Sequence, residues 1–138
     1  MISAADYRAR FKEVLVLGTG GSSLGGRALY EMAASEHLTG RPALHIITNV
    51  DPFVFERMIR RFDFTQTGVI VISKSGGTTE TMMQFLTVLP LMRAQIGDAK
   101  LGEHVTLITE PGSQVTLAQE IETLNLYLDI ERMRFEER

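Results

Sequence analysis

The residues best suited to chemistry lie in one nine-residue segment, Ser73–Thr81. It holds five hydroxyl side chains, two glycines and one lysine between a short apolar run and a stretch with helical spacing. Hydroxyls and backbone N–H groups at the start of a helix bind phosphate, and Lys74 supplies a positive charge. A capping turn explains one or two of these hydroxyls but not five. The segment therefore favours binding of a phosphate monoester.

A second candidate loop runs from Gly18 to Gly26 and contains five glycines and two serines. Its glycines allow a ligand to approach the backbone, and Ser22 and Ser23 add hydroxyl donors. The loop departs from the dinucleotide-binding fingerprint, because Ser23 stands where that motif has glycine. It also departs from the nucleotide P-loop, whose Gly-Lys-Ser/Thr is replaced by Gly25-Gly26-Arg27. An anion-binding loop and a tight turn with a serine cap both remain open.

A third polar segment, Thr48–Pro52, also follows an apolar run. Asp51 before Pro52 is typical of a helix start, with the carboxylate as the cap. Asn49 is placed at the end of the preceding strand, where it faces the same crevice as the other two loops. Glu80, in the first turn of the helix after the lysine loop, suits the positive end of the helix dipole.

The elements that position these loops follow from hydrophobic periodicity. Continuous apolar runs without polar alternation indicate strands buried on both faces, and strands alternating with helices indicate a parallel sheet between helical layers. The predicted strands are Val14–Leu17, Leu44–Thr48, Val69–Ser73 and Val105–Thr109. The predicted helices are Ala4–Lys12, Leu24–His37, Pro52–Arg61 and Thr78–Ile96, with Pro90 expected to kink or end the last of them. In such sheets ligands bind beyond the carboxyl ends of the strands.

Composition excludes several classes of protein. The 138-residue chain has no cysteine, which rules out a disulfide scaffold, a thiolate zinc site and a cysteine nucleophile. Its net charge of −3 does not indicate a nucleic-acid-binding surface. The apolar runs are too short to span a bilayer, and the N-terminus lacks the apolar stretch of a signal peptide. We expect a cytoplasmic protein that binds neither nucleic acid nor a membrane.

Together the three loops resemble the N-terminal sugar-isomerase (SIS) domain of the glucose-6-phosphate isomerase family, over about Tyr7 to Pro111. The order and spacing of the loops agree with that family as well. The stretches that carry the resemblance are Val16–Gly25, Ile47–Pro52 and Ile72–Thr81.

The resemblance implies a three-layer α-β-α domain with a parallel sheet of four or five strands. It also implies the glycolytic and gluconeogenic interconversion of glucose 6-phosphate and fructose 6-phosphate, without a metal or organic cofactor. The sugar phosphate would lie between the first and third loops. The phosphate-binding residues carried over are Ser22, Ser73, Lys74, Ser75 and Thr78, and the backbone at Gly20 and Gly21 would lie against the sugar. Ser75 stands where many members have threonine.

The residues that perform the family's chemistry are not recognised in this sequence. Isomerisation passes through an enediol and uses a glutamate base, a histidine and an arginine, which belong to later motifs. We interpret His37, His45 and His104 as structural or solvated, the latter two at strand starts away from the ligand edge. The 138 residues alone are expected to be inactive, with no catalytic residue assigned and with Glu80 and Asn49 as secondary candidates.

The last part of the chain differs from the rest. We divide the sequence into a SIS domain, residues 1–112, and a C-terminal helical tail, residues 113–138, which carries the whole net negative charge. The tail predicts an amphipathic helix of about twenty residues, and a helix to Thr123 followed by a strand over Leu126–Ile130 is the alternative. The apolar face of the helix consists of Leu117, Ile121, Leu124, Leu128 and Phe135.

The tail also resembles a helix of LytS-type sensor histidine kinases that precedes the ATP-binding domain. That match includes neither a phosphorylated histidine nor nucleotide motifs, so it does not predict kinase activity. Three interpretations remain: part of an isomerase, a regulatory SIS module that binds a phosphosugar, or a chimera joined near Gly112-Ser113. We expect the tail to dock across the chain's own domain, with a homodimer formed through the tail as the alternative. The matching positions are Leu117, Glu120, Tyr127, Leu128, Ile130, Glu131, Arg134 and Phe135.

Overall fold

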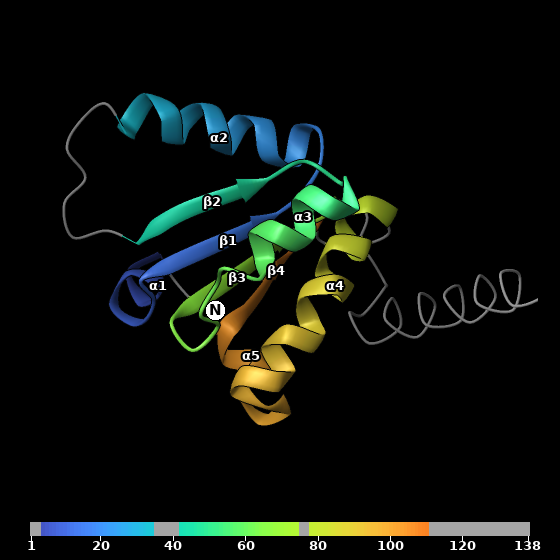
Figure 1. Cartoon of the computed structure of the whole chain (residues 1–138). Helices are drawn as coiled ribbons and strands as arrows, with labels where there is room; N and C mark the ends of the chain where they lie inside the picture. Colours follow the sequence, from blue (N-terminus) through green and yellow to red (C-terminus); the bar gives the residue numbers. More distant parts are fainter. Residues whose placement is uncertain (1–3, 35–41, 75–77, 111–138) are drawn as a thin grey trace, which may run out of the picture.

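A computed structural model describes residues 4–34, 42–74 and 78–110 of the chain. In this part four parallel strands form one sheet in the order β2-β1-β3-β4 (Figure 1). The two central strands are the more deeply buried pair. The four strands are β1 (Glu13–Leu17), β2 (Ala43–Ile47), β3 (Thr67–Ile72) and β4 (Val105–Ile108).

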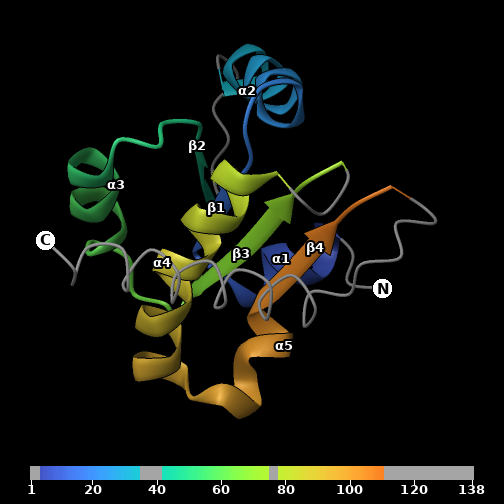
Figure 2. The same ribbon diagram turned by 90° about the vertical axis from the view of Figure 1, so that its right-hand side faces the viewer.

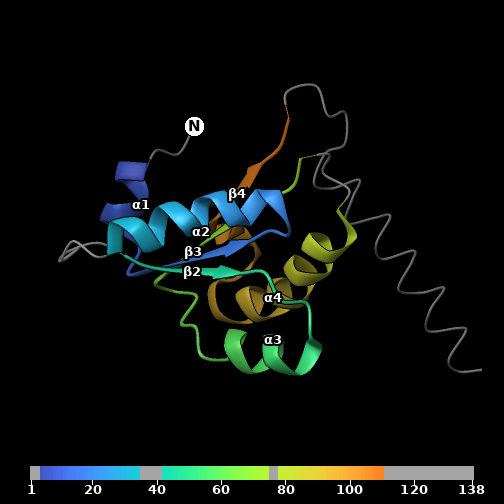
Figure 3. The ribbon, with the colours of Figure 1, turned by 90° about the horizontal axis from the view of Figure 1, so that it is seen from above.

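Helices cover both faces of the sheet, and Figure 3 shows α1 and α2 on one side with α3 and α4 on the other. The three-layer α-β-α arrangement expected from the sequence is therefore confirmed. Figure 2, which views the molecule from a perpendicular direction, shows α5 leading directly into β4. The helices are α1 (Ala4–Arg10), α2 (Gly21–Ala34), α3 (Pro52–Ile59), α4 (Thr79–Ile96) and α5 (Leu101–His104), with a 3-10 turn over Asp98–Lys100.

The core divides into two clusters because side chains alternate between the faces of each strand. On one face, Val14 and Val16 of β1 pack with Tyr7 and Phe11 from α1 and the residue that follows it. On the other face α3 and α4 cover the sheet in a larger cluster. Its fully or almost fully buried members include Leu15, Leu17, Ile59, Phe64, Val69, Val71, Phe85, Val88 and Met92.

Helix α2 is the least embedded of the longer helices. Ser23 is its one fully buried residue among those described, and Leu24, Leu29 and Met32 are exposed. The helix runs beside β2 and is anchored at its N-terminal end by the turn that leaves β1 (Figure 1).

Of the two outcomes predicted for Pro90, a kink or the end of the helix, the second is wrong, because α4 continues through Pro90 to Ile96, the last residue of the predicted range. Proline removes one helical N–H donor, but Pro90 lies on the exposed side of α4, where water can bond the carbonyl left without a partner. Buried Val88, Leu89 and Met92 hold the helix against the sheet on both sides of the proline. His45 is the third residue of β2 and not at its start.

Some of the sequence predictions lie outside the described residues. These are the end of the second predicted helix with His37, the loop residue Ser75, and the tail from residue 113 onward with its predicted helix. In the part of the chain that is described, none of the helices is long and apolar enough to cross a membrane.

Candidate functional site

Strand register brings the three polar loops to one edge of the sheet. Leu17 of β1 is aligned with Ile47 of β2 and with Val71 of β3, so the segments that follow these residues start at the same level. Neighbouring strands are spaced by about 4.8 Å. The loops after β1, β2 and β3 are therefore adjacent, as the sequence predicted for a parallel sheet.

The first and third loops are in direct contact at Gly18. A Cβ atom built on Gly18 would lie 3.3 Å from the backbone oxygen of Ile72 and 3.6 Å from the Cβ of Ser22. Glycine at this position lets the backbone after β1 pass close to the backbone just before Ser73. This contact places the start of the first loop against the end of β3, directly before Ser73.

Ser73 and Thr78 flank the lysine loop and are bonded to each other. The buried Ser73 Oγ donates to Thr78 Oγ1 at 3.1 Å and also accepts from the Thr78 backbone N–H at 3.4 Å. The Thr78 hydroxyl accepts from Ser73 and so keeps its own proton for a further hydrogen bond. Within the described residues, the pair leaves the Thr78 hydroxyl proton without an acceptor at the start of α4.

The N-terminus of α4 has no cap among the described side chains. Thr78 occupies the N-cap position, yet its side chain makes no cap hydrogen bond. The first amides of a helix have no partner inside the helix, and they carry the positive end of its dipole. The amides of Thr79, Glu80 and Thr81 are therefore directed to the edge of the sheet where the three loops meet.

The neighbouring helix α3 is capped by its own chain. Asp51 Oδ1 accepts from the N–H groups of Phe53 at 3.1 Å and Val54 at 2.9 Å, with Pro52 in the first turn. This confirms the interpretation of Asp51 as a cap. The difference between α3 and α4 matters, because the helix without a cap is the one that follows the hydroxyl-rich loop.

In the first loop the two serines have different surroundings. Ser23 is buried, and its Oγ donates to the backbone oxygen of Gly20 at 3.1 Å, which makes it a turn residue. Gly20 has a positive φ of 55°, a conformation that favours glycine. Ser22 is half-buried, and its hydroxyl has no hydrogen bond within the described residues. Gly20 and Gly21 are exposed at the turn, next to Ser22.

Asn49 is used within the second loop itself. Its Oδ1 accepts from the Asp51 backbone N–H at 2.8 Å, which forms a local turn before α3. Its backbone oxygen accepts from Gln84 Nε2 of α4 at 3.3 Å. Sequence reasoning did not single out Gln84, because a polar residue in a helix gives no local signal of a partner 35 positions away.

Lys74 has an acidic partner that sequence reasoning also missed. Lys74 Nζ lies 3.5 Å from Glu110 Oε1, and both side chains are largely exposed. The backbones are also paired, since Glu110 N–H donates to the Lys74 oxygen at 3.1 Å. The available sequence signal was the position of Glu110 just after the fourth strand, at the same edge as the lysine loop. Glu80 is exposed in the first turn of α4.

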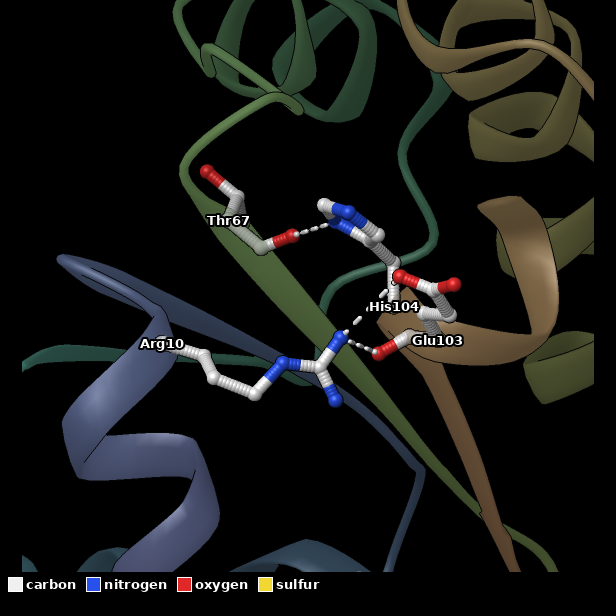
Figure 4. A network of polar contacts seen from close by, with 4 residues as sticks. All are labelled: Arg10, Thr67, Glu103 and His104. Atoms are coloured by element: carbon white, nitrogen blue, oxygen red, sulfur yellow. Dashed lines mark hydrogen bonds and ion pairs between the residues drawn. The ribbon is translucent and has the colours of Figure 1, made fainter.

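The described histidines lie away from this edge. His104 is buried at the opposite end of the sheet, where its Nδ1 lies 3.1 Å from the Thr67 backbone oxygen (Figure 4). Beside it, Arg10 Nη2 donates to the Glu103 backbone oxygen at 2.8 Å and lies 3.6 Å from its carboxylate. His45 Nε2 lies 3.4 Å from Glu13 Oε1. These contacts support structural roles for His45 and His104.

A groove lies between α3 and α4, next to the edge where the loops meet. Its volume is about 490 Å³, and its lining is mostly apolar, with Phe55 and Ile59 from α3 and Leu91 from α4. Val50 and Glu80 border the groove on the side of the second and third loops, and Gln84 lies in its wall. Among the described residues no group of three or more histidine or acidic side chains is placed to hold a metal ion.

Comparison with protein families matches residues 5–127 to the family model described as phosphoglucose isomerase. The matched range includes the whole described part of the chain from Ala5 onward and extends into the segment assigned to the tail. The boundary near residue 112 stays a prediction.

Individual curated proteins agree with the family match. The chain is 34% identical over 128 residues to the glucose-6-phosphate isomerase of Carboxydothermus hydrogenoformans, covering 86% of this chain and 27% of that protein. It is 40% identical over 116 residues to the glucose-6-phosphate isomerase of a Synechococcus species, covering 80% of this chain and 20% of that protein. The chain thus spans about a fifth to a quarter of the length of these relatives.

Solved structures show the same similarity. The crystal structure of a glucose-6-phosphate isomerase from Chlamydia trachomatis superposes with a TM-score of 0.70 at 28% identity, covering 79% of this chain and 20% of that one. A hypothetical protein from Thermus thermophilus superposes with a TM-score of 0.68 at 28% identity, covering 83% of this chain and 27% of that one.

Proposed function

This chain belongs to the phosphoglucose isomerase family, and from that premise we propose that it forms the sugar-phosphate-binding part of a glucose-6-phosphate isomerase. The whole protein would interconvert glucose 6-phosphate and fructose 6-phosphate. The observation that carries the proposal is the uncapped N-terminus of α4, beside the bonded pair Ser73 and Thr78. Amides, hydroxyls and a helix dipole directed to one point form a binding site for a phosphate group.

We assign the phosphate of the sugar to the space between the first and third loops. Thr78 would donate its hydroxyl proton, and Ser22 would donate from the other side, since its hydroxyl has no other partner in the described segments. Ser73 would act chiefly by orienting Thr78. Lys74 would contribute charge, and Ser75, which lies outside the described residues, would add a further hydroxyl.

The sugar itself would lie against the backbone at Gly20 and Gly21, which are exposed and carry no side chain to exclude it. Asn49 is engaged in its own turn and would contribute indirectly, by holding the second loop in place. Proton transfer between the two sugar carbons would require a base within hydrogen-bonding reach of the substrate. We assign no catalytic residue in this chain, and the reaction as proposed requires no cofactor.

In this proposal the partner is a small phosphorylated sugar, the protein is cytoplasmic, and self-association of the chain to a homodimer is the further partner. Neither a nucleic acid nor a membrane is among the proposed partners.

The test is a titration of the isotope-labelled chain with fructose 6-phosphate, followed by the chemical shifts of its backbone amides. We expect weak binding, in the millimolar range or about −4 kcal/mol, with shifts at Gly20–Ser23 and at Ser73–Thr79. Inorganic phosphate should shift the same amides, whereas fructose without phosphate should not. Unmoved amides in both loops at tens of millimolar ligand would contradict the proposal.

A further inference from the structure

Two buried polar atoms near the start of α4 have no partner within the described residues. They are Thr81 Oγ1 and Gln84 Oε1. Thr81 is completely inaccessible to solvent, and Gln84 is 3% exposed. Buried polar groups in folded proteins are almost always hydrogen-bonded to protein or to ordered water. Two such atoms on adjacent turns of one helix therefore indicate a partner that the described residues do not supply.

The two residues are neighbours on one side of the helix. Positions three apart in an α-helix lie on adjacent turns, with their Cβ atoms about 5–6 Å apart. A single water molecule can bridge side chains at that separation. It would donate to the Gln84 amide oxygen and accept from the Thr81 hydroxyl, which matches the hydrogen-bonding capacity of each atom.

Gln84 also links α4 to the second loop of the candidate site. Its Nε2 donates to the backbone oxygen of Asn49, whose side chain forms the turn that leads to Asp51 and α3. The amide of Gln84 can be held in one orientation only if its oxygen is satisfied as well as its nitrogen. A water at the oxygen would therefore fix the nitrogen on Asn49.

We propose that Thr81 and Gln84 bind one buried water molecule, and that Gln84 thereby acts as a positioning residue that holds the second loop against α4. Because Thr81 is fully enclosed, the bound group is a trapped water and not a hydroxyl of the dissolved sugar. The site stabilises the wall of the crevice next to the phosphate loop without touching the ligand.

The first test is a crystal structure of the full chain at a resolution that shows ordered water. We expect a water within hydrogen-bonding distance of both Thr81 Oγ1 and Gln84 Oε1. A structure in which the two atoms bond directly to protein groups, or in which the space between them is empty, would overturn the proposal.

The second test is a double-mutant cycle on thermal stability with Thr81→Val and Gln84→Met, which keep the shape of each side chain. Both single variants lose the same water, so the double variant should be little less stable than Gln84→Met alone. The matched control pair is Thr87→Val and Gln95→Met on the same helix, whose hydrogen bonds are to separate groups, Met83 O and Phe64 N–H. The stability losses of the two control variants should add in their double variant. If the losses of Thr81→Val and Gln84→Met added in the same way, the two residues would not share a water.

The positioning role has its own measurement. In the free protein, Gln84→Met should shift the backbone amides of Asn49–Asp51, and Gln95→Met should leave them in place. Unchanged amides in Gln84→Met would contradict the role. A further readout, which rests on the proposed function, is the affinity for fructose 6-phosphate. This affinity should fall several-fold in Gln84→Met but not in Gln95→Met. The affinity for inorganic phosphate should also fall in Gln84→Met and stay the same in Gln95→Met. If Gln84→Met weakened the binding of fructose 6-phosphate but not that of inorganic phosphate, Gln84 would contact the sugar directly. That result would overturn the proposal of a trapped water.

Discussion

The Ser73 hydroxyl donates to the Thr78 hydroxyl at 3.1 Å, and it accepts from the Thr78 backbone N–H at 3.4 Å. These two bonds join the end of β3 to the start of α4 across the lysine loop. They also explain why Thr78 does not cap its own helix. The side chain that would close the N-terminus of α4 is held by the strand instead, and the amides that follow remain available to an anion.

The Ser73–Thr78 pair predicts separate effects on stability and binding. Ser73→Ala removes a buried donor and should lower the free energy of unfolding by about 1 kcal/mol. It should also weaken fructose 6-phosphate binding, because Thr78 is no longer oriented. Thr78→Val should weaken binding at least as much. Titrations and thermal melts compare both with Thr87→Val, which loses a hydrogen bond to Met83 O on the exposed side of the same helix and should leave the affinity unchanged. Wild-type affinity in Thr78→Val would remove Thr78 from the site.

Because Glu110 lies beside Lys74, we expect its carboxylate to compete with a bound phosphate for the lysine. Glu110→Gln removes a carboxylate 3.5 Å from Lys74 Nζ, so phosphate binding should tighten by about twofold to threefold at low salt. Lys74→Ala should weaken binding and reduce its dependence on salt. The control is Glu103→Gln, whose carboxylate pairs with Arg10 at the opposite end of the sheet. Weaker phosphate binding in Glu110→Gln would show that the carboxylate serves the site and does not compete with the ligand.

We expect the addition of one methyl group at Gly68 to lower the stability of the fold substantially. A Cβ atom there would lie 2.5 Å from a ring carbon of Tyr7 and 2.6 Å from one of Phe11. Gly68→Ala should lower the free energy of unfolding by about 1–3 kcal/mol, because the rings must move within the cluster between α1 and the sheet. Gly102→Ala is the control, since nothing lies within 4 Å of its Cβ position. Denaturant unfolding measures both, and equal stability of the two variants would contradict the packing described for α1.

Tyr7 predicts a loss of stability at alkaline pH. Burial raises the pKa of Tyr7, whose hydroxyl is hydrogen-bonded to Thr106 Oγ1 at 2.8 Å and to the Val69 backbone oxygen at 3.2 Å. The folded chain keeps the phenol proton at a pH where the unfolded chain has lost it. This contribution is therefore complete below about pH 10 and decreases as the pH rises through the raised pKa.

Tyr7→Phe tests this dependence directly. The variant should be less stable than the wild type at neutral pH by about 1 kcal/mol, through the lost hydrogen bonds. The difference between the two proteins should shrink above about pH 10, as the wild type loses its contribution. Unfolding free energies measured from pH 7 to 11 give the comparison. A difference that stays constant across this range would show that Tyr7 does not titrate with folding.

Most of the fold was predictable from the sequence because its signals are local. Short apolar runs give the four strands to within about two residues, and Asp51 with Pro52 gives the start of α3. Both patterns depend on residues adjacent in the chain. The course of α4 past Pro90 was less well predicted, because packing against the sheet outweighs the local preference of proline.

The sequence also determined that the glycine and lysine loops lie at one edge of a parallel sheet, since the direction of the strands follows from their connections. Tertiary structure decided which groups in those loops are free. Ser23 is engaged in a turn and Ser22 is not, Thr78 is held by Ser73, and Lys74 faces Glu110. Gln84 and Asn49, 35 positions apart, meet only after α4 packs beside the second loop. Such pairings depend on distances between elements, which hydrophobic periodicity does not encode.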